Sequence, residues 1–407
     1  MLHPQEINIE DYNYPLPNDM IALHPLNQRD ESRLLVYRDE KISSNKFSNL
    51  PGLVPENSTL VFNDTRVVNA RILFSKKTGS KIEVFCLESV SAKEGFEKVF
   101  SSRGKSEWKC FVGGASKWRE GDLELTTTYN GNPLTLRATL KEKKDGYYIV
   151  LFSWTPEHIP FGEVIQLTGS VPLPPYIKRN ADRQDEERYQ TLLARNEGSV
   201  AAPTAALHFT ESVLNDLQTG GTGIETITLH VGAGTFKPVS SERLAEHEMH
   251  AEWMDVSLQT IRRLATKNFI IPVGTTSLRT LESLYWFGVK IMRGNTSMQL
   301  SQWEVYDLEN ATCNISAEMA LKSLADWMNS QGAERLFTKT SILIAPGYKM
   351  RVANALITNF HQPKSTLLLL VAAAIGKEWK SVYTYALENN FRFLSYGDSS
   401  LLFFPQG

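Results

Sequence analysis

The chain has 407 residues, which is longer than a typical single domain and predicts two domains, with insertion of one into the other as one arrangement. Hydrophobic residues make up 42% and charged residues 22%, near the averages for folded globular proteins, and no low-complexity tract indicates a disordered tail. A net charge of −2 excludes a general attraction to phosphate, so contact with nucleic acid would depend on local patches such as Lys178-Arg179 or Lys141, Lys143 and Lys144.

The start of the chain and the cysteines favour the cytoplasm. The residues from Met1 to Tyr14 are polar and acidic, without the basic start and apolar run of a secretory signal. Cys86, Cys110 and Cys313 are widely spaced and odd in number, which fits neither a disulfide framework nor a CxxC zinc site. We therefore predict a protein of a reducing compartment, with a cytoplasmic location.

The first strand predicted to end in a polar cluster is Ser58 to Phe62. The segment from Phe62 to Arg71 then places a carboxylate, a hydroxyl and two guanidinium groups after a hydrophobic run. Polar residues at strand ends often carry the chemistry of a protein. The alternative is a structural turn, in which Asp64 caps backbone amides and pairs with Arg66.

From Ile72 to Trp154 the pattern changes to short β-rich runs. Turn signals such as Asn130-Gly131 and Asp145-Gly146 separate these runs. This pattern predicts an inserted all-β domain, most simply a small barrel. The predicted strands are Lys81 to Leu87, Trp108 to Val112, Leu123 to Thr128, Leu134 to Leu140 and Tyr147 to Phe152.

After Val171, helical stretches alternate with short buried strands. Such alternation predicts an α/β sandwich, and we expect a larger three-layer α/β domain. The helix from Thr210 to Leu217 would begin at Thr210 as its N-cap. The predicted strands are Glu225 to Val231, Phe269 to Val273 and Thr340 to Ala345, and the other predicted helices are Ser277 to Trp286, Ser316 to Met328 and Lys380 to Asn389.

Two loops in this part of the chain combine small residues with histidine. The segment from Ser199 to Thr210 places His208 before a helix start, where free amides can hold an anion, although an isolated histidine is also common as a packed structural residue. The segment from Leu229 to Phe236 is a strand followed by a glycine loop that lets backbone approach a ligand. Neither GxGxxG nor GxxxxGK[ST] occurs, and His247-x-x-His250 lacks the HExxH spacing of a zinc site.

The last polar segments lie near the C-terminus. The turn and helix from Val273 to Ser283 could cradle an anionic group, with Arg279 one turn into the helix. The loop from Asn359 to Thr366 crowds donors around Pro363, and its alternative interpretation is a solvated loop before a core helix. The apolar run from Leu367 to Ile375 is too short to span a bilayer, so we expect no membrane association.

Taken together, these segments resemble the S-adenosylmethionine:tRNA ribosyltransferase-isomerase family of queuosine biosynthesis, in the same order along most of the chain. The resemblance implies an α/β catalytic domain of residues 1–71 plus 155–407, with a β-barrel domain of residues 72–154 inserted. The matching strings are YPLPNDMIALHPLNQRDESRLLV, LVFNDTRVVNAR, PLPPYIKR, RYQTLLARNEGSVAAPTAALHFT, LHVGAGTFKPV, EHEMHAEW, VGTTSLRTLES, GYKMRVANALITNFHQPKSTLLLLVAAA and FRFLSYGDSSL.

The resemblance also implies a reaction. The substrates are S-adenosylmethionine and tRNA that bears an aminomethyl-deazaguanine, and the products are epoxyqueuosine in tRNA, adenine and methionine. S-adenosylmethionine is consumed as a substrate, so no cofactor and no metal is expected. The sulfonium acidifies the adjacent ribosyl carbon, so the chemistry needs a general base there and an acid to help adenine leave.

We assign the matching residues to three roles. Asp64, His208, His230 and His361 form the pool from which base and acid are drawn. The expected substrate-binding residues are Arg66, Gly232, Gly234, Thr235, Thr275, Thr276, Arg279, Asn359, Ser365 and Thr366, with Arg279 suited to the methionyl carboxylate. Lys178, Arg179 and Lys364 are expected to contact tRNA phosphates.

Two other functions remain open at this point. A tRNA-binding relative without turnover would keep the fold, and a general nucleotide-dependent hydrolase would need the Walker or Rossmann motifs that this chain lacks. Two departures from the family pattern are Ala206 before Leu207-His208 and Gln362 after His361. The segment between Val289 and Lys339 is longer than the family's usual connection, and we expect its removal to spare the fold.

Overall fold

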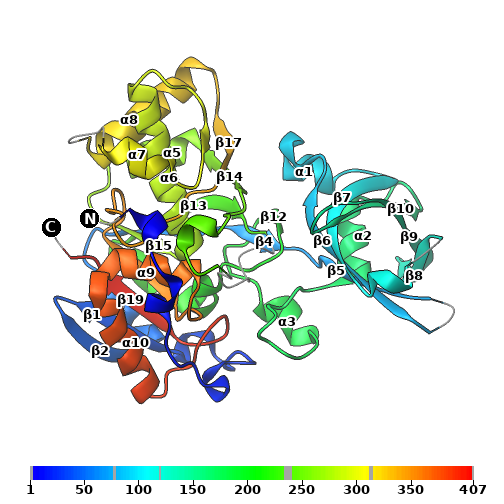
Figure 1. Cartoon of the computed structure of the whole chain (residues 1–407), viewed down its shortest axis with the longest axis horizontal. Helices are drawn as coiled ribbons and strands as arrows, with labels where there is room; N and C mark the ends of the chain where they lie inside the picture. The colour runs from blue at the N-terminus through cyan, green and yellow to red at the C-terminus, as the bar shows by residue number, and fades with distance from the viewer. Residues whose placement is uncertain (1–2, 77–78, 119–120, 233–240, 311–314, 406–407) are drawn as a thin grey trace.

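The computed structural model describes residues 3–76, 79–118, 121–232, 241–310, 315–405, with the side chain of residue 310 excepted. Figure 1 shows two lobes of unequal size, of which the larger contains both chain ends. The larger lobe is a mixed α/β structure around a ten-stranded sheet, and the smaller is a curled antiparallel sheet of seven strands. Within the described residues, no helix is both long and apolar enough to cross a membrane.

The large sheet is parallel at its centre and mixed toward its edges, where parallel and antiparallel pairs both occur. Its order is β16-β17-β14-β13-β3-β15-β18-β19-β1-β2, and the run from β13 to β18 is parallel throughout. Because the central strands are covered on both faces, their residues are almost all buried, as parallel sheets require. The strands are β1 Arg33–Arg38, β2 Lys41–Lys46, β3 Thr59–Asn63, β13 Gly223–His230, β14 Glu252–Ser257, β15 Ile270–Val273, β16 Gln299–Leu300, β17 Arg335–Thr340, β18 Ala355–Asn359 and β19 Ser399–Phe403.

Alternate residues of the central strands pack on helices of opposite faces. In β3, Leu60 and Phe62 belong to the cluster that contains α4, whereas Val61 packs with α5, α6 and α8. Thr210 caps α4 and Ser316 caps α8, each by accepting a hydrogen bond from a backbone amide of its first turn. The α-helices are α1 Phe96–Phe100, α2 Phe161–Thr168, α3 Arg183–Arg188, α4 Glu211–Thr219, α5 Leu258–Leu264, α6 Thr275–Met292, α7 Glu304–Asn310, α8 Ala317–Ser330, α9 Thr366–Ile375 and α10 Trp379–Glu388.

Short 3-10 helices occur mainly in the loops. One of them, η8, precedes α4 and contains His208. They are η1 Pro4–Glu6, η2 Ile9–Tyr12, η3 Asn18–Met20, η4 Arg29–Glu31, η5 Phe47–Gly52, η6 Ala92–Glu94, η7 Ala115–Lys117, η8 Thr204–His208, η10 Leu244–Glu246 and η11 Gly376–Glu378.

The small sheet curls around α2, as Figure 1 shows. Phe161 at the start of α2 contacts the rings of Trp108, Phe152 and Trp154, which alternate inward along their strands. Asn130 and Gly131 have positive φ in the turn that joins β8 to β9, as the sequence signal predicts. The order is β11-β5-β6-β7-β10-β9-β8. The strands are β5 Arg71–Ser75, β6 Lys81–Ser89, β7 Lys105–Gly113, β8 Leu123–Tyr129, β9 Asn132–Lys143, β10 Tyr148–Thr155 and β11 Gly169–Ser170.

The chain enters and leaves the small lobe side by side. Strand β11, where the chain returns, pairs antiparallel with β5, where it leaves the large lobe. A side chain at Gly169 would overlap the backbone carbonyl of Asn69, so only glycine fits this crossing. A further pair of short strands, β4 Thr65–Val67 and β12 Asn196–Ser199, lies next to it on the large-lobe side.

Contacts away from that crossing also join the lobes. Glu88 of β6 accepts hydrogen bonds from Trp253 Nε1 of β14 at 2.9 Å and from Lys339 Nζ of β17 at 3.0 Å. The ring of Phe96 in α1 stacks on His230 with centroids 3.9 Å apart. The small sheet is therefore held against the large one by a charged contact and an aromatic one.

One predicted strand is wrong. The run from Thr340 to Ala345 was expected to be a strand, but the strand is β17, Arg335–Thr340, and residues 341–345 are irregular. The irregular run is nevertheless buried, with Ile342, Leu343 and Ile344 in the core. The apolar composition of residues 341–345 reflects their burial and not a strand. In β17, by contrast, buried residues alternate with more exposed ones, as is typical of a strand.

The segment between Val289 and Lys339 is not a detachable insertion. It supplies β16, α7, α8 and most of β17, and α8 packs on α6 through Leu321, Leu324 and Met328. At Gly288 in α6 a side chain would overlap the backbone of Ala320 in α8, so the two helices approach as closely as helices can. The structure therefore argues against the expectation that trimming the segment spares the fold.

Replacing Gly288 with alanine is expected to lower the free energy of unfolding by about 2 to 3 kcal/mol, because the new methyl group forces two packed helix backbones apart. Urea unfolding measures this change. Gly52→Ala is the matched control, since nothing lies within 4 Å of a side chain there. Equal urea midpoints for Gly288→Ala and Gly52→Ala would contradict the close approach of α6 and α8.

Candidate active site

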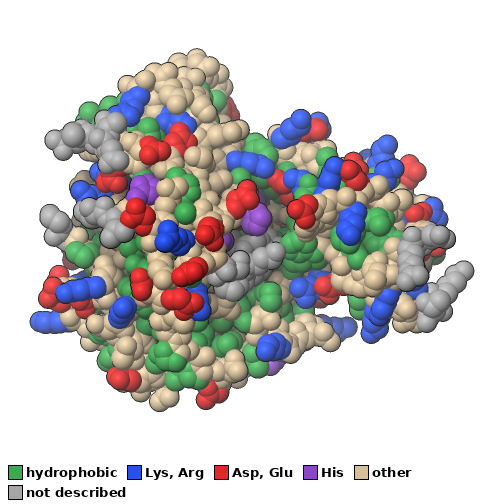
Figure 2. All heavy atoms as spheres, in the orientation of Figure 1, with side chains coloured by type: hydrophobic (Ala, Val, Ile, Leu, Met, Phe, Trp, Pro, Cys, Tyr) green, Lys and Arg blue, Asp and Glu red, His purple; other side chains and the backbone are tan. Residues whose placement is uncertain are grey.

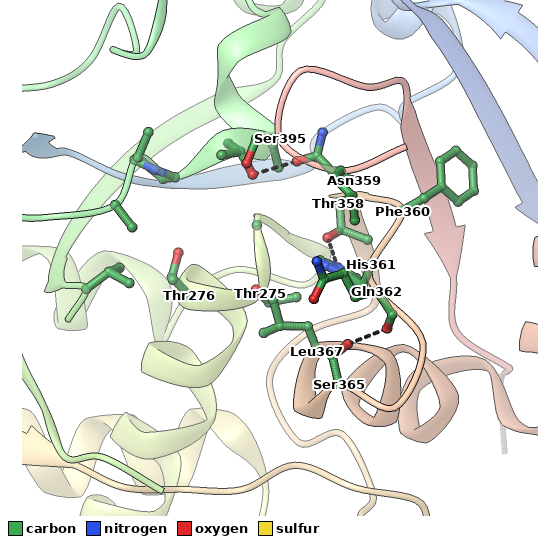
Figure 3. A pocket seen from close by; sticks show the side chains of 18 of the residues that line it. Thr275, Thr276, Thr358, Asn359, Phe360, His361, Gln362, Ser365, Leu367 and Ser395 are labelled. Carbon is green, nitrogen blue, oxygen red and sulfur yellow. Dashed lines mark hydrogen bonds between the residues drawn. The ribbon is translucent and has the colours of Figure 1, made fainter. Parts of the chain in front are cut away.

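A pocket lies where the central parallel strands of the large sheet reach their carboxyl ends. Figure 3 shows Thr275 and Thr276 on one side of it and the loop with His361 on the other. Loops at this edge of a parallel sheet commonly carry a binding site. The lining residues are Tyr176, Ala201, Ala202, Pro203, Thr204, Ala205, Val231, Gly274, Thr275, Thr276, Arg279, Thr358, Asn359, Phe360, His361, Gln362, Ser365, Leu367, Leu394 and Ser395.

The start of α6 forms one wall of the pocket. Gly274 precedes the helix with φ of 91°, and no side chain caps the first turn. The hydroxyl oxygen of Thr276 is buried without a hydrogen-bond partner among the described residues. A helix start of this kind has free amides and a partial positive charge, so it suits an anion.

Arg279 lies one turn further along α6 and is 4% exposed. Its Nη1 donates to Glu252 of β14 in a buried ion pair, and its Nε donates to the backbone oxygen of Ile342 at 3.2 Å. Its Nη2 is buried and contacts no acceptor in the part of the chain that the structure describes. Two of the three guanidinium nitrogens are thus held by protein acceptors, and Nη2 remains without one among the described residues.

The loop after β18 forms the opposite wall. His361 hydrogen-bonds through Nε2 to the hydroxyl of Thr358 at 2.9 Å, as the dashed line in Figure 3 marks. The Tyr383 hydroxyl accepts from its backbone amide, and the Tyr14 hydroxyl donates to its carbonyl oxygen. Burial lowers the pKa of His361 to about 3, so the ring is neutral at pH 7.

Asn359 connects the pocket to His208. Its Nδ2 lies 3.3 Å from His208 Nε2, and its Oδ1 accepts from Thr204 at 2.8 Å. Asn359 and Thr204 line the pocket, whereas His208 lies behind them against Phe47. Burial lowers the pKa of His208 to about 4.

The remaining residues of this loop have structural contacts. Ser365 lines the pocket and caps α9 by accepting from the backbone amide of Leu368 at 3.2 Å. Lys364 pairs with Glu10 at 2.6 Å. Thr366 is the first residue of α9 and is not among the lining residues.

Asp64 and His230 lie outside the pocket, in the packing between β3, β13 and the small lobe. Asp64 accepts from Thr228 at 2.7 Å and from Asn196 at 3.0 Å, and burial raises its pKa against these hydrogen bonds. His230 stacks on Phe96, and burial lowers its pKa to about 3. In this structure both residues therefore have structural partners and neither faces the pocket.

The other predicted residues lie at the surface or beside the pocket. Arg66 is half exposed, 3.9 Å from Glu197, in a second hollow between the lobes. Arg179 forms a two-point ion pair with buried Asp185, whereas Lys178 is exposed. Gly232 follows β13, directly after the lining residue Val231. The predicted residues Gly234 and Thr235 lie outside the described residues.

The predicted site residues that share the pocket are Thr275, Thr276, Arg279, Asn359, His361 and Ser365. Sequence reasoning missed Glu252, the partner of Arg279, and Thr358, the partner of His361. Glu252 stood in the matched string EHEMHAEW, so its carboxylate between apolar residues was a usable signal. In the described parts of the chain, no group of three or more His, Cys, Asp or Glu side chains is placed to hold a metal.

The buried histidines predict a pH dependence of stability. The unfolded chain binds protons below the ordinary histidine pKa, whereas His208, His230 and His361 resist protonation in the fold, so stability falls as the pH is lowered from about 6.5 toward 4. Each buried histidine contributes a slope of up to about 1.4 kcal/mol per pH unit in that window. Urea unfolding at several pH values should therefore give a shallower slope for His230→Gln than for the wild type.

His250→Gln is the control, because His250 is exposed. The raised pKa values of Asp64, Glu282 and Asp398 act in the opposite sense, but they are common to both proteins and cancel in the comparison. Equal slopes for the wild type and His230→Gln would contradict the prediction.

Comparison with known proteins places the chain in a family. The family model described as queuosine biosynthesis protein matches residues 9–402. A protein of Dechloromonas aromatica named S-adenosylmethionine:tRNA ribosyltransferase-isomerase is 37% identical over 401 residues, which cover 97% of both chains. One of the same name from Ruegeria pomeroyi is 36% identical over 410 residues, covering 97% of this chain and 99% of its own.

A solved structure also matches. It is an S-adenosylmethionine tRNA ribosyltransferase from Thermotoga maritima, 24% identical, with 96% of this chain and 99% of that chain covered and a TM-score of 0.45. The family model and the curated relatives span nearly the whole sequence, and the matched range includes every residue that lines the pocket. The chain therefore belongs to the queuosine biosynthesis protein family.

Proposed function

We propose that the chain is an enzyme that transfers and isomerises the ribosyl group of S-adenosylmethionine onto the aminomethyl-deazaguanine of tRNA, giving epoxyqueuosine, adenine and methionine. The curated relatives are named after this activity, as S-adenosylmethionine:tRNA ribosyltransferase-isomerases. The observation that carries the proposal is the single pocket in which Thr276, Arg279 and His361 meet. These residues come from two segments far apart in sequence, both of which belong to the resemblance.

The residues of the pocket meet the demands of the reaction. A base must remove a proton from the carbon beside the sulfonium, and His361 is the candidate because it lines the pocket and is unprotonated at pH 7. His208 stays in the pool because Asn359 links it to the pocket wall. Asp64 and His230 are proposed to act only by holding β3 and β13 in place, since their side chains pack away from the pocket.

The tRNA contacts remain proposals. Lys178 is exposed and available to a phosphate, whereas Lys364 pairs with Glu10 and Arg179 with Asp185. Figure 2 shows acidic and basic side chains interspersed over both lobes on the face in view. Recognition of tRNA by a few local contacts, and not by one large basic surface, fits this distribution and the net charge of −2.

For the architecture, we propose a three-layer α/β domain of residues 1–71 plus 155–407, with a β-barrel domain inserted as residues 72–154. Helices on both faces of the large sheet support the first part. The β-rich core of the small sheet supports the second part. The contacts of this domain continue past residue 154, because α2 packs inside the small sheet and β11, which ends at Ser170, pairs with β5. A cytoplasmic location fits both the tRNA substrate and the few, scattered cysteines.

The test is adenine release. The purified protein is incubated with S-adenosylmethionine and with tRNA that carries the aminomethyl-deazaguanine, and adenine is quantified by chromatography. Release that depends on the modified tRNA is expected, with unmodified tRNA as the control. Binding of the modified tRNA without adenine release would identify a relative that has lost turnover and would overturn the proposal.

A further inference from the structure

The buried ion pair between Arg279 and Glu252 is left incomplete by the protein. Arg279 Nη2 and Glu252 Oε1 are both buried, and neither has a hydrogen-bond partner among the residues that the structure describes. The two side chains are 5% and 3% exposed. A buried charged group without its full set of hydrogen bonds is costly, so a pair that served stability alone would be expected to have partners for these atoms.

Glu282, on the same helix as Arg279, shows a buried carboxyl group whose oxygens both have partners. Its Oε1 accepts from the amide of Val352 at 2.9 Å, and its Oε2 accepts from Tyr348 at 2.7 Å and the amide of Arg351 at 2.9 Å. Both oxygens are satisfied by protein donors. Buried guanidinium nitrogens without a partner among the described residues also occur at Arg71, Arg188, Arg351 and Arg392. What distinguishes Arg279 is that it lines the pocket, where a ligand can reach its free nitrogen.

The free donor of Arg279 lies on the same helix wall as other anion-binding groups. The Thr276 hydroxyl, one turn earlier on α6, is also buried and unpartnered within the described residues. The uncapped start of α6 adds free amides and a partial positive charge. One guanidinium nitrogen, one hydroxyl and a helix start suit a planar anion of single charge.

We propose that this wall is a carboxylate subsite that binds the amino-acid carboxylate of the sulfonium substrate, with Glu252 as a positioning residue that holds Arg279 for it. The inference rests on the proposed function. Arg279 Nη2 and Thr276 Oγ1 donate to the carboxylate, while Glu252 holds Nη1 of the same guanidinium. The small side chains of Ala201, Ala202 and Ala205 leave room for the adjoining methylene groups.

A phosphate group is the competing occupant. Its larger charge would call for more cationic groups than this wall offers, since the charge of Arg279 is already matched by Glu252. A single remaining guanidinium donor fits a carboxylate better. Inorganic phosphate therefore serves as a competitor in the test, and it is expected to leave binding of the substrate unchanged.

The test compares S-adenosylmethionine with its decarboxylated form by calorimetry. Both compounds have the sulfonium and the amine, so they differ only in the carboxylate. The wild type is expected to bind S-adenosylmethionine at least about tenfold more tightly, the effect of losing a charge-assisted hydrogen bond. Glu252→Gln and Arg279→Gln are expected to reduce this ratio toward one.

Glu225→Gln is the control, because Glu225 also pairs with an arginine, the half-exposed Arg263, and does not line the pocket. It is expected to keep the wild-type ratio. If the role of Glu252 were only structural, Glu252→Gln would weaken the binding of both compounds alike. An unchanged ratio of the two affinities in Glu252→Gln would therefore contradict the positioning role.

The possible outcomes distinguish a failure of the carboxylate subsite from a failure of the proposed function. Equal binding of the two compounds by the wild type overturns the carboxylate subsite and leaves the proposed function standing. Displacement by inorganic phosphate overturns it in favour of a phosphate site. Failure of the wild type to bind either compound overturns the proposed function itself, and the subsite with it.

Discussion

Replacing His361 with alanine is expected to lower the rate of adenine release by about 100-fold to 10,000-fold, the range for loss of a general base or acid. The ring lines the pocket, is neutral at pH 7, and is held by Thr358. Stability should change far less, because the lost side chain is one member of a well-packed loop. Adenine release and urea unfolding, measured on the same preparation, check both parts.

Two variants control this experiment. His250→Ala removes an exposed histidine and should keep full activity. His208→Ala removes the histidine behind Asn359, and a smaller loss than at His361 is expected because its effect passes through Asn359. Wild-type adenine release in His361→Ala would remove His361 from the pool of bases and acids.

Deleting residues 295–339 and closing the gap with a short glycine linker is expected to abolish cooperative unfolding. The deletion removes β16 and nearly all of β17 from the large sheet and strips α8 from α6 and α5. We expect the deletion to expose Leu281, Leu284 and Trp286, whose side chains are fully buried in the intact chain. Each large apolar side chain that loses its cover costs about 1.5 to 3 kcal/mol, so a few such residues exceed the net stability of a typical domain.

Size-exclusion chromatography and urea unfolding measure the result of the deletion, which should aggregate or lack a sharp transition. Lys322→Ala, on the exposed side of α8, is the control and should unfold like the wild type. A monomeric deletion variant with a wild-type midpoint would mean that the segment is dispensable after all.

Local sequence patterns located most elements because their signals were strong. The strand before Asn63 and the helix capped by Thr210 are as expected. The miss at Ile342 to Ile344 has a physical reason, since a fully buried irregular segment and a buried strand have the same apolar composition. The true strand, β17, had the alternating pattern, but its charged outward residues concealed it.

The site was predictable only where a segment follows a central strand directly. Thr276 and His361 meet in the pocket because the carboxyl ends of parallel strands share one edge of the sheet. Asp64 follows β3 and His230 ends β13, but Asp64 is hydrogen-bonded to Thr228 and His230 stacks on Phe96 of the small lobe, so neither lines the pocket. Nor could local sequence reveal that Arg279 pairs with Glu252, because that contact spans 27 residues and depends on the sheet order.

The paired crossing of β5 and β11 makes the small lobe replaceable in principle. Since the chain leaves and rejoins the large lobe at adjacent points, a turn of a few residues is long enough to close the gap. A module of another size carried there would have to replace the contacts that Glu88 and Phe96 make with the large sheet. It would also have to keep Gly169, because the backbone of Asn69 occupies the space that any side chain would need.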